Sequence, residues 1–195
     1  MQRAYIGMGA NIDSPTGAPE ATLAAAAERL RCLGTLLCRS SLHSTEPVGF
    51  ADQPRFVNAV VALETDLGAR ELLDRLLGIE LEFGRDRSTG IRNGPRTLDL
   101  DLLLLGNKVL HQAGVEIPHP RLAERMFVLV PLNEIAPDLV VVTHGKTVKE
   151  LLQTLQRGFP AETDAVLPLQ SDVWRAGPCG DGGVRADARD ADRNG

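Results

Sequence analysis

Two aspartates stand inside an apolar run that has the composition of a β-strand. The run extends from Leu98 to Leu105, and Asp99 and Asp101 are its only polar residues. Residues two apart in a strand point to the same face, so the two carboxylates are predicted to lie side by side. The residues of the opposite face, which are predicted to face the core, are Leu98, Leu100, Leu102 and Leu104. Carboxylates within roughly 7 Å of each other repel, and partial burial adds to the cost unless a metal ion or an arginine neutralises them.

The ligand chemistry of this pair favours magnesium. No His or Cys stands beside the aspartates, and oxygen-only ligation suits a hard ion that carboxylates, water and substrate phosphates surround together. The preceding segment carries four arginines, whose planar guanidinium groups suit phosphate oxygens: Arg85, Arg87, Arg92 and Arg96. A polyphosphate with its metal ions is therefore expected between the arginines and the acids. The alternatives are a solvated loop whose arginines pair with nearby acids, and an Asp-x-Asp pair at an exposed strand end.

Length, charge and cysteine content limit the other possibilities. The chain has 195 residues and a formal net charge of −5, which fits one domain over residues 1–170 and argues against a nucleic-acid or anionic-membrane surface. Residues 171–195 have almost no apolar periodicity and are predicted to be a disordered tail. The three cysteines suggest neither a disulfide framework nor a zinc site. With no apolar leader and no apolar run long enough to span a membrane, a cytoplasmic location is expected.

The hydrophobic pattern predicts an α+β fold. Strands are expected at residues 3–9, 35–43, 56–63 and 98–105, with helices at 19–33 and 69–83. This βαββαβ order is that of a ferredoxin-like two-layer sandwich, whose sheet is mainly antiparallel and carries both helices on one face. The other face is left for a site or for C-terminal helices at 127–135 and 148–155. The Gly106–Asn107 turn predicts that residues 108–110 return as a hairpin, and Gly7 and Gly9 are expected at a strand end and tight turn.

Three further residues interrupt their local patterns. Asn58 lies in an apolar strand and shares a face with Phe56, so its amide is suited to the polar edge of a flat heterocycle stacked on that ring. A structural role at a sheet edge explains Asn58 equally well. Glu80 lies within the apolar stripe of a helix, where pairing with an arginine is the favoured interpretation. His119, between two prolines, would by itself most often be structural.

Together these residues resemble the 6-hydroxymethyl-7,8-dihydropterin pyrophosphokinase family. The segment from Gly94 to Asp101 is similar to the family signature, and the resemblance covers about residues 3–155. It implies transfer of pyrophosphate from ATP to the pterin alcohol in folate biosynthesis, with Asp99 and Asp101 binding two Mg²⁺ ions. Catalytic roles are implied for these two aspartates and for Arg85 and Arg96, which would clamp phosphates. A monomer that binds no nucleic acid or membrane is expected.

The resemblance also implies the two substrate sites. The ATP site would comprise Glu80, Arg85, Arg87, Arg96, Leu102, His119 and Arg125, with Leu102 against the adenine and residues 84–94 closing over the substrates. The pterin would stack between Phe56 and Phe127, and the rest of its site would comprise Thr45, Pro47, Val48, Asn58 and Asp99. Asn93 stands where some relatives have an aromatic residue, and Phe56 replaces a tyrosine of some members.

Two other classes of protein remain open at this level. A non-catalytic ferredoxin-like module that senses a nucleotide or metal would share the fold and bind without forming AMP. An RNA-binding domain of similar topology would need exposed aromatics and a basic face. The aromatic content of 4% and the acidic net charge disfavour that second class.

Overall fold

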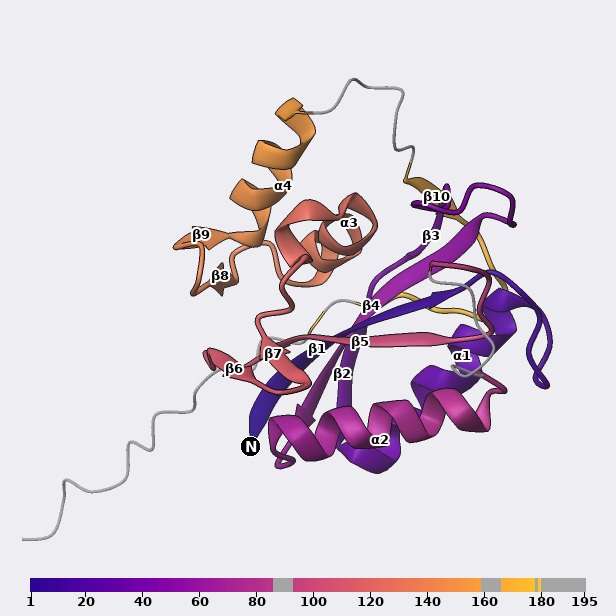
Figure 1. Cartoon of the computed structure of the whole chain (residues 1–195), viewed down its shortest axis with the longest axis horizontal. Helices are drawn as coiled ribbons and strands as arrows, with labels where there is room; N and C mark the ends of the chain where they lie inside the picture. The colour runs from indigo at the N-terminus through magenta and orange to yellow at the C-terminus, as the bar shows by residue number, and fades with distance from the viewer. Residues whose placement is uncertain (86–92, 159–165, 178, 180–195) are drawn as a thin grey trace, which may run out of the picture.

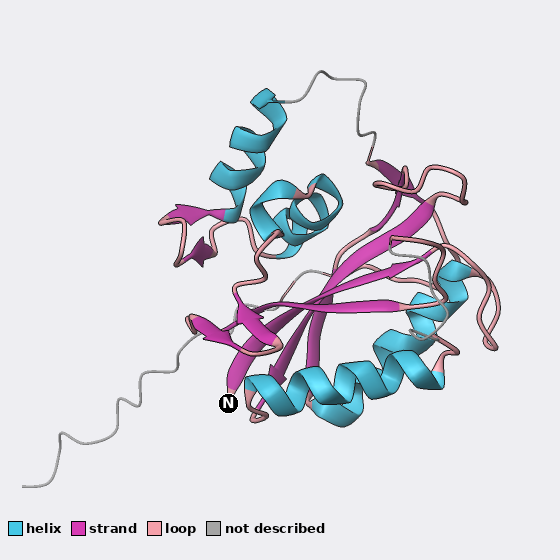
Figure 2. Ribbon diagram, in the orientation of Figure 1, coloured by secondary structure: helices cyan, strands magenta, loops and turns pink. Residues whose placement is uncertain are grey.

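The protein is described here by a computed structural model over residues 1–85, 93–158, 166–177 and 179. A twisted sheet lies at the centre, with helices on both of its faces (Figures 1 and 2). The helices are α1 (Pro19–Arg29), α2 (Ala69–Glu82), α3 (Met126–Ile135) and α4 (Val148–Gly158), and short 3₁₀ turns span Leu30–Leu33 and Leu122–Glu124. The strands are β1 (Gln2–Ala10), β2 (Thr35–Arg39), β3 (Leu42–Thr45), β4 (Phe56–Thr65), β5 (Asp99–Leu105), β6 (Leu110–Gln112), β7 (Val115–Ile117), β8 (Val140–Val141), β9 (Lys146–Thr147) and β10 (Leu167–Leu169).

The main sheet has the order β10-β3-β4-β1-β5, and β2 also pairs with β4. Every pairing in it is antiparallel, which confirms the predicted mainly antiparallel sheet. One strand was predicted over residues 35–43, whereas the structure divides it into β2 and β3. The break lies at Ser40, whose N–H donates to the Val60 carbonyl and whose Oγ accepts the Val60 N–H. This side chain therefore replaces part of the regular backbone ladder.

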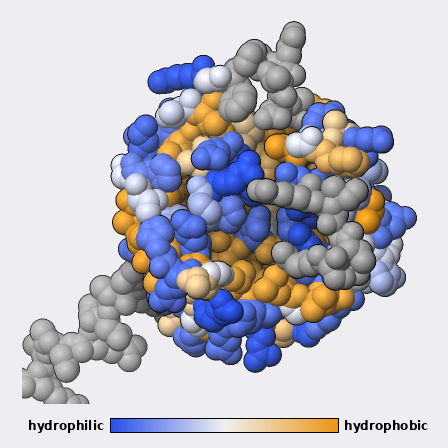
Figure 3. Space-filling model, in the orientation of Figure 1, coloured by the Kyte–Doolittle hydropathy of each residue, from blue (hydrophilic) through white to orange (hydrophobic). Residues whose placement is uncertain are grey.

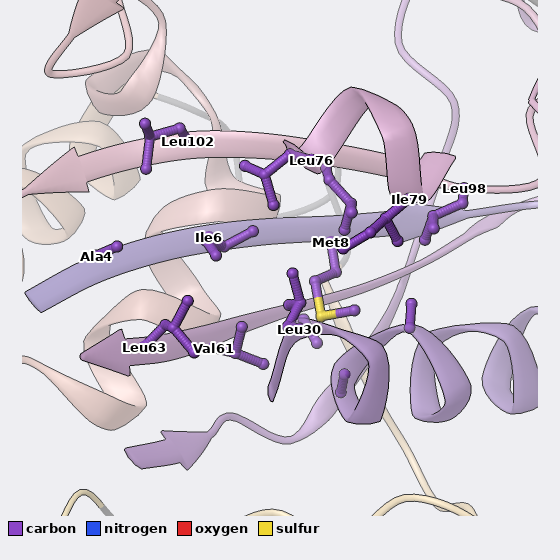
Figure 4. Packing of buried hydrophobic residues seen from close by; sticks show 14 of the residues in the cluster. Ala4, Ile6, Met8, Leu30, Val61, Leu63, Leu76, Ile79, Leu98 and Leu102 are labelled. Carbon is purple, nitrogen blue, oxygen red and sulfur yellow. The ribbon is translucent and has the colours of Figure 1, made fainter. Parts of the chain in front are cut away.

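Side chains alternate between the two faces of the central strands and form two hydrophobic cores. Ile6 and Met8 of β1 pack with α1 and α2 in one cluster, as Figure 4 shows for part of it. Tyr5 of β1 and Val60 of β4 belong to a second cluster with residues of α3 and α4. The first two helices thus share one face as predicted, and the C-terminal helices cover the other, which makes three layers.

A β-bulge interrupts the alternation of side chains that was predicted for β5. The β1–β5 register shifts between Tyr5 and Ile6, whose partners are Leu104 and Leu102. Leu102 packs in the first core, whereas Leu103 and Leu104 both belong to the second. Leu104 was predicted to share a face with Leu102. The prediction was wrong because one extra residue in a strand reverses the alternation beyond it.

The glycines of β1 and the predicted hairpin also differ from expectation. Gly7 and Gly9 lie inside β1 and not at its end. Residues 108–110 do not return along β5, because β6 pairs instead with β7. A glycine is required at position 34, where a Cβ would lie 2.1 Å from the carbonyl oxygen of Glu64.

The segment after α4 runs along the outer edge of the sheet. β10 pairs with β3, and Gly177 exchanges two backbone hydrogen bonds with Arg39. Trp174 is 6% exposed, and its Nε1 donates to the Ser40 carbonyl at 2.8 Å. A disulfide joins Cys38 to Cys179, and Cys32 is a free, exposed cysteine. The prediction of disorder from residue 171 is therefore wrong for residues 171–177, because Trp174 contributes apolar burial without any periodic pattern. The expected absence of disulfides is also wrong.

Within the described ranges, no helix combines the length and apolar character needed to cross a membrane.

Candidate active site

A cavity of about 270 Å³ opens between β3, β4, β5 and the start of α3. The predicted charged residues in its wall are Arg85, Arg96, Asp99, Asp101, His119 and Arg125. The predicted residues of the flat-ring site in the same wall are Thr45, Val48, Phe56, Asn58 and Phe127. Figure 3 shows hydrophilic residues gathered around the middle of this face of the molecule, with hydrophobic residues between them. The structure thus brings together side chains from segments far apart in the sequence.

Asp99 lies between two arginines. Oδ2 of Asp99 accepts from Nη1 of Arg96 at 2.8 Å, and Oδ1 forms an ion pair with Arg85. The side chains of Arg85 and Arg96 are 14% and 21% exposed. These pairs neutralise the Asp99 charge, as its position in an apolar strand requires.

Glu80 supports this cluster from behind. It is 1% exposed, and its Oε1 accepts from the Arg85 Nη1 at 2.9 Å and from the Leu100 N–H at 2.8 Å. Glu80 therefore links α2 to β5 and orients Arg85. It does not line the cavity, so the expected pairing with an arginine is found, whereas the implied direct contact with a nucleotide is not supported.

Asp101 is the less strongly paired acid. The Nη1 of Arg125 lies 3.4 Å from its Oδ2, and 34% of the Asp101 side chain is exposed. Burial raises the pKa of the Asp101 carboxyl, the nearby Asp99 charge raises it further, and His119 and Arg125 oppose the rise. The charged form of Asp101 thus carries a net cost, which a bound cation would relieve.

His119 is oriented by backbone contacts. Its backbone N–H donates to the Leu103 carbonyl at 2.9 Å, and its ring Nδ1 accepts the backbone N–H of Arg121 at 3.1 Å. Since Nδ1 is an acceptor, the proton of the neutral ring lies on Nε2. Burial lowers the pKa of the His119 imidazole, which Asp101 partly counteracts. The ring is therefore suited to donate one hydrogen bond from Nε2 at neutral pH.

The other side of the cavity is an aromatic and amide slot. Asn58 is 6% exposed, and its Nδ2 donates to Oγ1 of Thr45 at 2.8 Å. Each aromatic ring has a guanidinium above it: Arg96 lies 5.2 Å from the centroid of Phe56, and Arg125 lies 5.5 Å from that of Phe127. These cation–π contacts connect the slot to the charged cluster.

Gly9 makes this slot possible. It lines the cavity next to Asn58, its cross-strand partner in β4. A Cβ at position 9 would lie 3.0 Å from Oδ1 of Asn58. A side chain there would compete with the amide for space, so the role of this glycine is close approach and not a turn.

A second cavity, also about 270 Å³, adjoins the first along β5 and the β6–β7 hairpin. Leu102 is in its wall, and Asp101 and His119 line both cavities. The hairpin residues of the wall, including Gln112, Val115 and Glu116, were not identified from the sequence. Their segment has no distinctive motif that would have indicated a binding role.

Besides Glu80, two predicted residues are not placed in the cavities. Pro47 lies between Thr45 and Val48, which line the first cavity, but is not itself in the wall. Arg87 lies outside the described residues, as does most of the loop 84–94 to which a closing movement was assigned.

Sequence reasoning missed Asn11, which organises the rim. Asn11 is 3% exposed. Its Oδ1 accepts the backbone N–H of Arg96 at 2.8 Å, and its backbone N–H donates to the Arg96 carbonyl. Its Nδ2 donates to Gln53 and Pro54 in the loop before β4. An asparagine directly after a strand was the only available signal, and turns commonly contain asparagine.

Comparison with known proteins identifies the relatives of this chain. The model of the 7,8-dihydro-6-hydroxymethylpterin-pyrophosphokinase family matches residues 5–137. A 2-amino-4-hydroxy-6-hydroxymethyldihydropteridine pyrophosphokinase from Pseudomonas aeruginosa is 46% identical over 152 residues, which cover 78% of this chain and 91% of the relative. The enzyme of that name from Haemophilus influenzae is 42% identical over 153 residues, with 78% and 92% covered.

Solved structures show the same fold at low sequence identity. The wild-type HPPK-DHPS of Plasmodium falciparum superimposes with a TM-score of 0.60 at 14% identity over 78% of this chain. The present chain spans only 41% of that longer protein, so the likeness concerns the shared fold alone.

Proposed function

The chain belongs to the 7,8-dihydro-6-hydroxymethylpterin-pyrophosphokinase family, and we propose how its residues carry out the reaction of that family. It transfers pyrophosphate from ATP to the hydroxymethyl group of 6-hydroxymethyl-7,8-dihydropterin, a step of folate biosynthesis. By atom balance, the other product is AMP. The enzyme is an ATP-dependent diphosphotransferase, and the roles below concern its individual residues.

Asp99 and Asp101 are assigned to two Mg²⁺ ions. Bound magnesium would supply charge neutralisation along the triphosphate. In support, both aspartates line the first cavity and the pair offers only oxygen ligands. Two carboxylates completed by water and phosphate oxygens are a normal donor set for magnesium, in contrast to an all-protein cage.

The arginines are proposed to exchange partners when the nucleotide binds. Without substrate, Arg85 and Arg96 pair with Asp99, and Arg125 faces Asp101. When triphosphate oxygens are present, these guanidinium groups bind phosphates bidentately and release the carboxylates for cations. The cluster is therefore kept neutral in both states, and positive charge is already placed where the phosphates will bind.

The nucleotide is assigned to the second cavity and to its junction with the first. The adenine would lie against Leu102, and His119 and Arg125 would face the phosphates. The shared wall of the two cavities supports this arrangement, because a base in one cavity would place a triphosphate over Asp101 and His119. The Nε2 proton of His119 is then available to a phosphate oxygen.

The pterin is assigned to the slot between Phe56 and Phe127. Asn58, with the backbone of Thr45 and Val48, would recognise its polar edge, and Asp99 would lie near its hydroxymethyl group. The support is geometric: an amide and two aromatic rings line one wall, next to the arginine cluster. The ring would thus be held with its alcohol directed toward the phosphates.

The chemical step proposed is in-line displacement. The hydroxymethyl oxygen attacks the β-phosphorus of ATP, the bond from that phosphorus to the α-phosphate oxygen breaks, and AMP departs. Arg85 and Arg96 neutralise the charge that develops on the phosphate oxygens. Asp99 is the proposed acceptor of the alcohol proton, because its side chain lines the same cavity as the slot.

Several broader assignments remain predictions. The strand order β5-β1-β4-β2/β3, with α1 and α2 on one face, supports the ferredoxin-like assignment of the core. A monomer, closure of residues 84–94 and a cytoplasmic location also stay predictions.

The observation that carries this assignment is that three arginines oppose two aspartates beside an aromatic slot. The test is incubation with MgATP and 6-hydroxymethyl-7,8-dihydropterin, followed by separation of the nucleotides. AMP should appear in equal amount to pterin diphosphate. ADP as the product would contradict attack at the β-phosphorus, and binding of both ligands without turnover would favour the non-catalytic alternative.

A further inference from the structure

A buried histidine beside the slot forms a hydrogen bond with a carboxylate on the covering helix. His43 of β3 is 3% exposed, and its Nε2 lies 2.7 Å from Oε1 of Glu134 in α3. The other oxygen of Glu134 accepts the Ser41 N–H, also at 2.7 Å. One carboxylate thus holds two points of the segment that enters β3. Neither His43 nor Glu134 lines the cavity, so direct contact with a substrate does not account for the pair.

The strand register places this pair beside the slot, on the same face of the sheet. His43 is the cross-strand partner of Asn58, and directly opposed residues of an antiparallel pair share a face. Thr45 follows two residues later on the same face. On the helix, Glu134 comes seven residues after Phe127, close to two turns, so the two side chains lie on the same side about 10 Å apart. The pair and the slot are therefore formed by the same faces of the same two elements.

Helix α3 also needs an external constraint between these points. Pro131 lies inside the helix and has no N–H, so the Phe127 carbonyl four residues earlier lacks its usual helical partner. The apolar side chains beneath the helix hold it against the sheet, but apolar packing is non-directional. The hydrogen bond to His43 is directional and charge-assisted, so it defines where the helix lies along β3.

We infer that the His43–Glu134 hydrogen bond positions the Phe127 wall of the slot over Asn58 and thereby sets the affinity for the flat heterocycle. The inference rests on the proposed placement of the pterin in this slot. His43 and Glu134 are positioning residues that act through Phe127, Thr45 and Asn58. Loss of the hydrogen bond should therefore weaken pterin binding far more than nucleotide binding, because the nucleotide-base cavity is formed by β5 and the β6–β7 hairpin.

The test uses the full chain with His43→Phe, Glu134→Ala and Glu134→Gln. The first keeps a ring of similar size and removes both nitrogens, and the second removes the carboxylate. The third keeps one carbonyl oxygen as an acceptor and replaces the other oxygen by an amide N–H donor. His144→Phe is the matched control, because His144 is exposed in the β8–β9 turn. KM for the pterin, KM for ATP and kcat are measured for each, and MgATP binding is titrated without pterin.

The KM for the pterin should rise roughly tenfold in His43→Phe and in Glu134→Ala, the size expected when one charge-assisted hydrogen bond is lost. Glu134→Gln should restore most of the affinity, and MgATP binding should change less than about twofold in every variant. The double variant His43→Phe/Glu134→Ala should be no worse than either single variant. A parallel rise in both KM values, an unchanged KM for the pterin, or additive effects would overturn the inference.

Two controls keep the test decisive. If His43→Phe does not fold, the comparison of Glu134→Ala with Glu134→Gln decides the question, because the Glu134 side chain is 34% exposed and its removal leaves no core cavity. If the wild-type chain does not bind the pterin or form AMP, the proposed function fails and not this inference alone.

Discussion

Replacing Asp101 with asparagine should make the protein more stable and inactive. The substitution keeps the shape of the side chain and removes a charge whose pKa is raised by burial and by Asp99. Two strand rises place the charges about 7 Å apart, where Coulomb's law gives about 2.4 kcal/mol at an effective dielectric constant of 20 and about 0.6 kcal/mol in water.

Two observations reduce this figure to a net gain of about 1 kcal/mol. The Asp101 side chain is 34% exposed, so solvent screens the repulsion. The variant also loses the attraction to Arg125, whose Nη1 lies 3.4 Å from the carboxylate. For a chain of this size, about 1 kcal/mol corresponds to a rise in Tm of about 2–4 °C.

Magnesium and nucleotide should reverse the order of the two proteins. A ligand at one hundred times its Kd stabilises the folded state by about 2.7 kcal/mol, which is roughly 5–11 °C for a chain of this size. Wild type should show such a shift with MgATP, and Asp101→Asn should show much less because one proposed ligand of the cation is missing. The melting temperatures measured without and with MgATP should therefore cross.

The pH dependence gives an independent check. The Asp101 pKa is higher in the folded protein than its ordinary value of 3.8, so the folded state holds this proton more tightly, and the contribution of Asp101 to stability decreases as the pH rises above 3.8. The advantage of Asp101→Asn should be full at neutral pH and should vanish as the pH falls below 3.8, where the wild-type carboxyl is neutral in both states.

Urea unfolding, thermal melting and the AMP assay measure these effects. Asp138→Asn is the control, because it makes the same charge change in an exposed loop after α3. A less stable Asp101→Asn protein would refute the electrostatic reasoning. Retained turnover with an unreduced MgATP shift would refute the metal assignment.

Three further substitutions test separate parts of the argument. Gly9→Ala should raise the KM for the pterin roughly three- to tenfold by displacing the Asn58 amide, with KM for ATP unchanged; equal changes in both would contradict the close-approach role. Trp174→Ala should cost about 3–5 kcal/mol in urea unfolding, and a loss below about 1 kcal/mol would show that the C-terminal segment does not support the sheet. Glu80→Gln should lower kcat by misorienting Arg85 and cost about 1–3 kcal/mol of stability, and an unchanged kcat would remove its positioning role.

Local pattern was sufficient for much of the fold. Helical spacing of apolar residues located α1 and α2, and the apolar run rich in β-formers located β4, because these patterns reflect the geometry of a single element. The pattern in β5 failed beyond Leu102, since a bulge depends on the pairing with β1 and leaves no mark in the leucine run itself. The C-terminal segment failed for a related reason: Trp174 is one residue without periodicity, and its burial depends on the shape of the sheet edge at Ser40.

The sequence alone determined the chemistry available to this protein. Two acids two residues apart in an apolar strand, next to several arginines, already required a cationic partner, because spacing along one strand decides which side chains share a face. Only the tertiary structure decided which arginine faces which acid, that Glu80 stands behind Arg85 and not in the cavity, and that His43 contacts a carboxylate ninety-one residues away. Those contacts join distant segments, and their energies depend on packing distances that no local spacing specifies.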